Sequence, residues 1–546
     1  MKSFTMSSSS QANQPSFLEG LNPQQKEAVT HSDGPLLIVA GAGSGKTRVL
    51  TYRIAYLLQQ FKASPQEILA LTFTNKAARE MKDRIVQLIG DPAHSLWMGT
   101  FHSVFSRILR VEAKKLGFGQ DFTIYDTSDA ETVIKQILQE LNYDPKQIKP
   151  RTIQYKISDA KNQLIDPDTY TRKFIDSTLD DITSRVYTTY KKRLKDSNAM
   201  DFDDLLVLPI ELFESDPELL EKYQNRFRYI LIDEYQDTNH AQYKVTKLLA
   251  DKHHNLCVVG DDDQSIYSWR GAEVGNILRF EKEYSNSVTI KLEKNYRSTG
   301  NILDAANQLI SNNKKRMGKT LWTDEKKGDK IEIVNSYNGE TEAVMVSDKI
   351  EEIQSMDSQL NSIAILVRAI FQTREFEERF LKIGVPYRII GGIKFYERAE
   401  VKDCVAYLKT VFQPQDDLAF ERILNVPKRS IGDTTVKAIN NFAKSNKCSL
   451  EVASKHLIEQ NKIKPKTKIG LNSLLNLLAK WRNDLNNKIN HNKLLQIILD
   501  ESGYSEMLKN KKDLENENRL ENIKELLNAM KEFDNLESFL EHVALA

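Results

Sequence analysis

The chain has 546 residues, enough for three or four domains of about 150 residues, so its fold does not depend on disulfides or a structural metal. Lys and Arg number 77 against 76 Asp and Glu, and the resulting net charge of +1 excludes an overall field that would attract a polyanion. Three scattered cysteines exclude a disulfide framework and a four-thiolate zinc site, which fits a reducing cytoplasm.

The first segment, residues 1–17, is rich in Ser and Gln and lacks the apolar stretch of a secretory signal. We expect it to be a disordered leader. No later window approaches about 18 consecutive apolar residues, so we expect no membrane-spanning helix. The sequence therefore predicts a cytoplasmic protein.

From residue 34, short apolar runs alternate with longer segments of helical period, the pattern of βα units around a buried parallel sheet. The candidate strands are 34–40, 68–74, 229–234, 255–261, 288–293, 331–337, 363–369 and 387–392. The last four are assigned to a second α/β module. Residues 101–227 are too long for one crossover connection and predict an inserted helical domain, and residues 400–546 predict another.

A glycine-rich loop follows the first strand and precedes a helix-forming segment. Its residues are Gly41, Ala42, Gly43, Ser44, Gly45, Lys46 and Thr47. Glycines let the backbone wrap a phosphate, Lys46 would reach the β and γ phosphates, and Thr47 would ligate Mg²⁺. The strict motif has Gly where Ala40 stands, and the alternative interpretation is a chance glycine-rich turn.

Two later strands end in polar residues that would lie at the same edge of the sheet. Asp233 ends one strand and would hold Mg²⁺, and the adjacent Glu234 would polarise the attacking water. The second strand leads into Asp261, Asp262, Asp263 and Gln264. Gln264 would sense the γ phosphate, unless this group is merely a solvated turn.

Several motifs follow one another in a specific order. They are the phosphate loop, LTFTNKAAREM (71–81), GTFHS (99–103), NAMDFDDLL (198–206), LIDEYQDTN (231–239), VVGDDDQSIYSWRGA (258–272), KNYRST (294–299) and KFYERAEVKD (394–403). Over residues 18–546 the chain resembles superfamily 1 DNA helicases of the UvrD/Rep/PcrA type, whose phosphate loop accommodates Ala40. The resemblance implies an α/β P-loop NTPase with two RecA-like parallel-sheet domains, each carrying a helical insertion, and ATP between them.

The resemblance also implies a division of the chain. Residues 18–117 and 200–295 would form the first RecA-like domain, with 118–199 as its helical insertion. Residues 296–390 would begin the second RecA-like domain, and 391–546 would be its insertion. The family's segments of the types TxHxxKGLE and YVAxTRA do not occur, so we expect an incomplete second domain in a chain truncated before its last two motifs.

Roles are assigned by position within these motifs. Gln25 matches the family's adenine-reading glutamine and Tyr296 its base-stacking aromatic, although Tyr296 and Arg297 alone would be an ordinary strand-end pair. The expected nucleotide-binding residues are Gln25, Gly41, Ala42, Gly43, Ser44, Gly45, Lys46, Thr47, Arg48, Tyr296 and Arg297. The expected catalytic residues are Glu234, Gln264 and Arg297, and the expected metal ligands are Thr47 and Asp233. ATP and Mg²⁺ are the implied ligands.

Aromatic side chains just after strands predict a track for unpaired bases, because stacking contributes about 1–3 kcal/mol per base whatever the sequence. The expected DNA-binding residues are Phe73, Thr100, Phe101, His102, Tyr267, Trp269 and Arg270. Taken singly, such aromatics more often belong to a core. Basic runs at 314–319 and 462–468 either contact phosphates or form a solvated face. Residues 427–439 resemble the family's duplex-contacting turn, with Ser430 where Gly is frequent.

The leading prediction is an ATP-dependent DNA helicase with 3′ to 5′ movement, acting in DNA repair or replication. Its expected partners are single-stranded DNA and ss/dsDNA junctions, with no membrane. The alternative is a truncated ATP- and DNA-binding fragment without helicase activity of its own, which needs a complementary C-terminal polypeptide. A P-loop GTPase is excluded because Asn75-Lys76-Ala77-Ala78 lacks the Asp of a guanine-reading NKxD motif.

Overall fold

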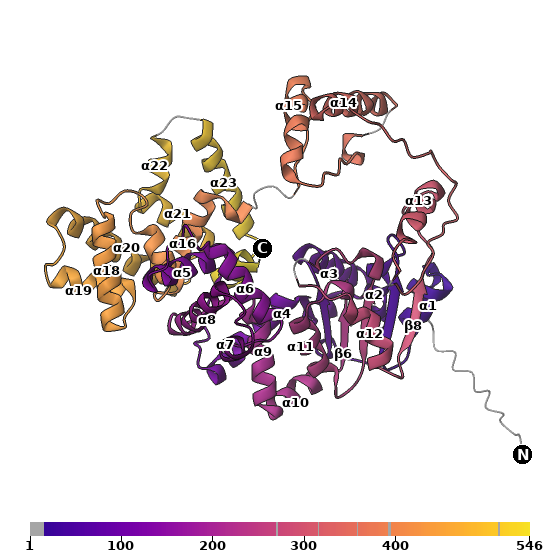
Figure 1. Ribbon diagram of the computed structural model, residues 1–546, viewed down its shortest axis with the longest axis horizontal. Coiled ribbons are helices and arrows are strands. Elements are labelled where there is room, and N and C mark those ends of the chain that lie inside the picture. The colour runs from indigo at the N-terminus through magenta and orange to yellow at the C-terminus, as the bar shows by residue number, and fades with distance from the viewer. Residues whose placement is uncertain are drawn as a thin grey trace, which may run out of the picture.

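One parallel sheet of six strands organises the N-terminal half of the molecule (Figure 1). The computed structural model describes residues 16–268, 271–314, 316–356, 359–390, 395–510 and 514–545. The strand order is β3-β2-β6-β7-β1-β8. The strands are β1 Leu36–Ala40, β2 Ile68–Thr72, β3 Trp97–Thr100, β6 Tyr229–Ile232, β7 Leu256–Gly260 and β8 Val288–Leu292. This sheet confirms the α/β prediction.

Both faces of the sheet are buried, because alternate residues of each strand belong to two different cores. Leu36 and Ile38 face one core, and Leu37 and Val39 face the other. The first core is covered by α1 Pro23–Thr30, α2 Lys46–Gln59 and α3 Asn75–Ile89. The second is covered by α4 Phe101–Glu112, α9 Asp204–Ser215, α10 Pro217–Arg226, α11 His240–Ala250 and α12 Gly275–Glu283. Burial on two sides explains why these strands are continuously apolar.

A helical insertion follows α4 and has a core of its own. Its helices are α5 Thr127–Glu140, α6 Pro150–Asn162, α7 Pro167–Lys173 and α8 Thr178–Asp196. Two short strands at its base, β4 Thr123–Tyr125 and β5 Ala199–Asp201, pair in parallel. The prediction of a helical insertion is right, but it missed these strands because three residues give too short an alternating pattern to recognise.

Three of the four strands predicted for a second module do not form within the described residues, so these strand predictions are wrong. The strand predicted at 288–293 is β8, which pairs with β1 in the first sheet. The segments 331–337, 363–369 and 387–390 are described but are not strands, and residues 391–392 lie outside the described part of the chain. Several of their apolar side chains face solvent: Ile333 is 91% exposed, Tyr337 97% and Leu366 95%. A strand requires a neighbour for its N–H and C=O groups, and the described chain offers these segments none.

The helices between residues 300 and 383 are α13 Gly300–Ile310, α14 Gly339–Ser355 and α15 Arg374–Ile383. Ala343 and Ile350 of α14 pack against Phe376 and Phe380 of α15. Figure 1 shows this pair standing apart from the sheet, joined to the rest of the chain by extended segments. The pair therefore has a small core without a sheet beneath it.

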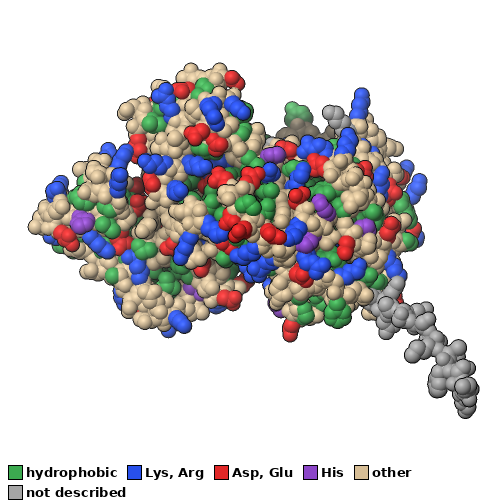
Figure 2. Space-filling view, turned by 90° about the horizontal axis from the view of Figure 1, so that it is seen from below, with side chains coloured by type: hydrophobic (Ala, Val, Ile, Leu, Met, Phe, Trp, Pro, Cys, Tyr) green, Lys and Arg blue, Asp and Glu red, His purple; other side chains and the backbone are tan. Residues whose placement is uncertain are grey.

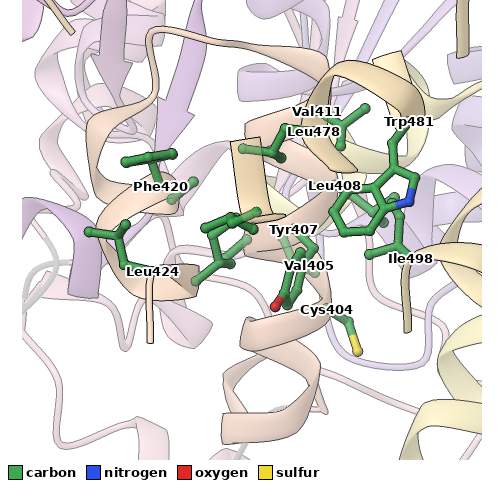
Figure 3. Packing of buried hydrophobic residues seen from close by; sticks show 14 of the residues in the cluster. Cys404, Val405, Tyr407, Leu408, Val411, Phe420, Leu424, Leu478, Trp481 and Ile498 are labelled. Atoms are coloured by element: carbon green, nitrogen blue, oxygen red, sulfur yellow. The ribbon is translucent and has the colours of Figure 1, made fainter. Parts of the chain in front are cut away.

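The C-terminal part is helical, as predicted. Its helices are α16 Ala399–Phe412, α17 Asp417–Ile423, α18 Asp433–Asn446, α19 Leu450–Glu459, α20 Pro465–Asn486, α21 His491–Glu501, α22 Tyr504–Lys509, α23 Leu514–Met530 and α24 Leu536–Leu545. Trp481 and Tyr407 lie in their common core with ring centroids 5.9 Å apart (Figure 3). The buried Trp481 indole donates to Glu501 Oε2 at 2.9 Å, so its polar atom is satisfied.

Short 3-10 helices complete the described structure. They are Ser16–Gly20, Pro65–Glu67, Asp91–Ser95, Ala113–Leu116, Tyr235–Asp237, Asp262–Gln264, Leu360–Ser362, Ile370–Thr373 and Phe395–Glu397. The first of them includes residues 16 and 17, which were predicted to belong to a disordered leader, and residues 1–15 lie outside the described range. Among the described helices, none combines the length and the apolarity needed to cross a bilayer.

The two helical regions contact each other through charges. Lys402 and Lys409 of α16 pair with Asp126 at 3.4 Å and Asp129 at 3.2 Å, at the N-terminal end of α5. At the other end of the chain, Glu537 of α24 lies 3.7 Å from the Arg110 guanidinium of α4. The C-terminal helices thus rest on elements of the N-terminal half.

Hydrogen exchange of the intact chain distinguishes the sheet that forms from the sheet that does not. We expect backbone amides of 331–337 and 363–369 to exchange with less than about 10-fold protection, because no ladder holds them. Amides of β6 and β7 lie at the centre of the sheet and are expected to exchange only by large-scale unfolding. Mass spectrometry of peptides after deuterium labelling measures both, and equal protection of 331–337 and β7 would contradict the described structure.

Candidate nucleotide and DNA site

The glycine-rich loop connects β1 to the first turn of α2, as the sequence predicts. Gly43 and Gly45 have φ of 69° and 90°, the left-handed region that favours glycine. Ser44 closes the turn, its hydroxyl donating to the Gly41 carbonyl at 2.8 Å. Because α2 begins at Lys46, the free N–H groups of its first turn face the loop, which is the arrangement that binds phosphate.

Lys46, Asp233 and Glu234 meet at the carboxyl edge of the sheet. The Lys46 ammonium lies 2.8 Å and 3.0 Å from the two Glu234 carboxylate oxygens. Asp233 is buried, and desolvation together with the neighbouring Glu234 charge raises its pKa to about 6. The Asp233 carboxylate is an oxygen donor of the kind that a hard cation such as Mg²⁺ prefers, and a bound cation would favour its charged form. The residues present therefore fit the implied metal.

The KNYRST segment docks directly onto the phosphate loop through Asn295. Its side-chain amide donates to the Ala42 carbonyl at 2.6 Å, and the next backbone N–H, of Tyr296, donates to the Gly43 carbonyl at 3.0 Å. The Asn295 Oδ1 accepts the Arg297 N–H at 2.8 Å. Sequence reasoning missed Asn295, although it lies within a recognised motif, because a structural amide has no chemical signature of its own.

Gln25 and Tyr296 both lie beside the loop, but Gln25 is engaged with protein. Its Nε2 donates to the Ser44 carbonyl at 2.9 Å, and its Oε1 accepts the Asn22 N–H at 3.2 Å. The Asn22 amide donates to the Tyr296 hydroxyl at 2.8 Å, while half of the Tyr296 side chain is exposed. Arg48 is exposed with its guanidinium 5.1 Å from the Tyr52 ring centroid. Tyr296 is thus half exposed beside the loop, with the Lys294 ammonium 5.4 Å from its ring centroid, whereas the Gln25 amide already has partners.

The acidic residues after β7 are not a solvated turn. The buried Lys319 ammonium lies 2.6 Å from both Asp261 and Asp263 and 3.2 Å from Asp262. Arg316 pairs with Asp263 at 2.6 Å, and Gln264 donates to Asp261. Because the Lys319 and Arg316 side chains are engaged in these ion pairs, they do not supply free positive charge to the phosphate-contacting run predicted at 314–319. Residue 315 of that run lies outside the described chain.

Two of the predicted DNA-binding residues, Phe101 and Thr100, are buried, and a third, His102, is only partly exposed. Phe101 is 1% exposed and stacks on Phe105, and Thr100 is buried and caps α4 by accepting the Ser103 N–H. The His102 ring lies 4.0 Å from the Phe202 ring, and burial lowers the pKa of His102 to about 3. A neutral imidazole supplies no positive charge to a phosphate.

Phe73 and Tyr267 retain partial exposure at the same edge of the sheet. The Phe73 ring meets that of Phe101 edge to face at 6.4 Å, and Tyr267 follows β7. The predicted residues Trp269 and Arg270 lie outside the described residues. Ser430, which stands where Gly is frequent in the family's turn, adopts a left-handed φ of 62°.

Charge on one face of the molecule is mixed rather than sorted by sign. Figure 2 shows one face of the molecule, on which Lys and Arg side chains are interspersed with Asp and Glu, with a local concentration of Lys and Arg near its centre. This agrees with the balanced composition of 77 basic and 76 acidic residues. Any polyanion contact on this face is therefore local.

The NAMDFDDLL motif forms the joint between the helical insertion and the sheet. The buried Lys161 ammonium of α6 lies 2.7 Å from both Asp201 and Asp204. Asn162 donates to Asp203 at 3.0 Å and accepts from Asn239, which caps α11, at 2.6 Å. Sequence reasoning used this motif only for recognition and missed its role, because the partner lysine lies in a separate helix.

The comparison with family models covers nearly the whole chain. Residues 21–285 match the UvrD/REP helicase N-terminal domain, and residues 290–546 match the UvrD-like helicase C-terminal domain. The chain belongs to the UvrD/REP helicase family. Membership agrees with the P-loop NTPase fold and with ATP-binding and DNA-binding functions. The match to the C-terminal domain runs to residue 546 and lends no support to the expected truncation within it.

Curated relatives are similar over almost all of this chain. The ATP-dependent DNA helicase PcrA of Bacillus subtilis (strain 168) is 47% identical over 519 residues, which are 95% of this chain and 70% of the relative. A probable DNA helicase II homolog of Rickettsia felis is 47% identical over 538 residues, 98% of this chain and 82% of the relative. PcrA of Staphylococcus aureus (strain Mu50) is 45% identical over 95% of this chain.

A methyl group added at Gly43 should weaken nucleotide binding. A Cβ there would lie 2.6 Å from Asn295 Nδ2 and 2.7 Å from Arg297 Cβ, at a left-handed φ. Strain of about 1–3 kcal/mol at such a position corresponds to about 5- to 150-fold weaker ATP binding by Gly43→Ala. Isothermal calorimetry measures this, with Gly432→Ala as the control because its Cβ has nothing within 4 Å. Equal affinity of the two variants would remove Gly43 from the site.

Proposed function

We propose that the protein is an ATP-dependent DNA helicase that moves 3′ to 5′ on single-stranded DNA and acts at ss/dsDNA junctions in DNA repair or replication. The observation that best supports this proposal is that the phosphate loop, Lys46, Asp233 and Glu234 lie together at one edge of the sheet. Phe73 and Tyr267 lie at the same edge. Nucleotide chemistry and a stacking surface thus adjoin. The names of the relatives, ATP-dependent DNA helicase PcrA among them, support the same activity.

The nucleotide roles are proposed residue by residue. Lys46 and the loop amides would hold the phosphates, Arg297 would reach the γ phosphate, and Glu234 would take up the proton of the attacking water. Mg²⁺, held by Thr47 and Asp233, would supply charge neutralisation at the phosphate oxygens when bound. Gln264 would respond to the γ phosphate. For Glu234 to act, its ion pair with Lys46 has to open, so phosphate must replace the carboxylate as the partner of Lys46.

The domain division remains part of the proposal. We assign 18–117 with 200–295 to the first RecA-like domain and 118–199 to its helical insertion. We assign 296–390 to the start of the second RecA-like domain and 391–546 to the helical insertion of that domain. The exposed segments 331–337 and 363–369 favour one further candidate function. In it, the chain binds ATP and DNA but needs a complementary C-terminal polypeptide whose strands pair with these segments before it unwinds DNA.

Replacing Lys46 should abolish ATP binding. Lys46→Ala removes the only charged partner that the described site offers to the Glu234 carboxylate and the charge proposed to meet the phosphates. We expect calorimetry with ATP and Mg²⁺ to show no saturable binding up to millimolar ATP and no DNA-stimulated hydrolysis. Lys191→Ala, on the exposed surface of α8, is the charge-matched control and should bind as wild type. Equal binding by Lys46→Ala would show that the nucleotide lies elsewhere.

Strand-displacement assays on residues 1–546 separate the two candidates. A helicase moving 3′ to 5′ should unwind a duplex with a 3′ single-stranded tail and leave a matched 5′-tailed duplex intact. The alternative predicts ATP and DNA binding without unwinding, and unwinding only after addition of a polypeptide carrying TxHxxKGLE-type and YVAxTRA-type segments. Equal unwinding of both tails would refute the proposed direction of movement.

A further inference from the structure

The buried side chain of Gln236 connects the two acidic loops of the nucleotide site. Its Nε2 donates to Glu234 Oε2 at 2.9 Å and to Asp237 Oδ2 at 3.2 Å. Its Oε1 accepts the backbone N–H of Asp261 at 2.9 Å. Gln236 is 1% exposed, so its donors and its acceptor are all used within the protein. None of the roles assigned above includes this residue.

The surrounding backbone is shaped to admit this amide. Gly260 ends β7, and a Cβ at Gly260 would lie 2.7 Å from Gln236 Oε1 and 2.8 Å from Ile277 Cδ1. Any other residue at 260 would displace the Gln236 side chain. Glu234, with a left-handed φ of 50°, turns the chain so that the 3-10 helix Tyr235–Asp237 follows at once. A non-glycine residue in this region stores strain that the surrounding contacts must hold.

Beyond Asp261, the connection continues to the residue proposed to sense the γ phosphate. The Asp261 carboxylate accepts from the Gln264 amide and pairs with Lys319 at 2.6 Å. The neutral side-chain amide of Gln236 therefore links the Glu234 carboxylate, which pairs with Lys46, to the first residue of the loop 261–264. The carboxylate of Glu234 is held on one side by an ion pair and on the other by this hydrogen bond.

We propose that Gln236 is a positioning residue that orients the Glu234 carboxylate and fixes its position relative to the loop 261–264. The inference rests on the proposed function, in which Glu234 activates water and Gln264 responds to the γ phosphate. A neutral donor fixes the direction of a carboxylate without cancelling its charge, so Glu234 stays oriented after Lys46 turns to phosphate. Misplacing a reacting group by about 1 Å costs about 100-fold in rate, so one oriented hydrogen bond is enough to matter.

Two substitutions separate the donating side of Gln236 from its accepting side. Gln236→Leu removes all three hydrogen bonds, to Glu234, to Asp237 and from the Asp261 N–H. Gln236→Glu keeps an oxygen that accepts the Asp261 N–H but replaces the donor to Glu234 and Asp237. We expect both variants to lose about 100-fold in kcat of DNA-stimulated ATP hydrolysis, with KM for ATP changed by less than about 3-fold. The DNA concentration giving half-maximal stimulation should rise in Gln236→Leu only.

The matched control is Gln242→Leu. Gln242 is also buried and accepts the Asn239 N–H at 3.1 Å in the cap of α11, but it touches neither acidic loop. It should lower the melting temperature as much as Gln236→Leu while leaving kcat near wild type. Equal loss of kcat in Gln236→Leu and Gln242→Leu, or unchanged kcat in Gln236→Leu, would overturn the positioning role.

Absence of ATP hydrolysis by the wild type would refute the proposed function by itself. The inference about Gln236 is then tested by a measurement that does not depend on catalysis. Deuterium exchange of the Asp261 amide should accelerate by at least about 10-fold in Gln236→Leu, because its acceptor is gone, and remain slow in Gln236→Glu. Unchanged exchange in Gln236→Leu would show that Gln236 does not hold the loop and would overturn the inference.

Discussion

All strands of the main sheet run in the same direction, and the rest of the molecule follows from this constraint. Parallel neighbours put every carboxyl end at one edge, so β1 delivers the phosphate loop where β6 delivers Asp233 and β7 delivers Asp261. Asn295, which follows β8, reaches Ala42 across a separation of 253 residues in sequence. Parallel pairing also requires crossover helices, and these supply the two cores that bury both faces of the sheet.

Most of this edge could be predicted from sequence, because its chemistry depends on residue types at fixed offsets from apolar runs. The phosphate loop, Lys46, Asp233 and Glu234 can be recognised in this way. The residues proposed to contact DNA are harder to predict, since Phe101 faces the core and Phe73 its rim although both follow strands of the same sheet. Asn295 and Gln236 were missed because their function lies in hydrogen bonds to backbone and to neighbouring side chains, which no local pattern encodes.

The second module shows why strands are harder to predict than helices. A helix makes its backbone hydrogen bonds within one segment, so α14 and α15 form with only a small shared core. A strand depends on a partner elsewhere in the chain, and the alternating apolar residues of 331–337 are necessary for pairing but do not provide it. Ile333 and Leu366 are therefore exposed despite sequences that resemble β1.

The β4–β5 pair at the base of the first helical insertion brings together the two points at which the insertion joins the sheet domain. The chain leaves through β4 and returns through β5, which pair residue by residue from Thr123 and Ala199 to Tyr125 and Asp201. Exit and entry points therefore lie side by side, and the length of chain between them adds little to the entropy of closing the loop. An insertion of this kind can grow, shrink or be exchanged during evolution without disturbing the order of the six strands. The nucleotide-binding edge of the sheet and the insertion can in this sense change separately during evolution, although they belong to one chain.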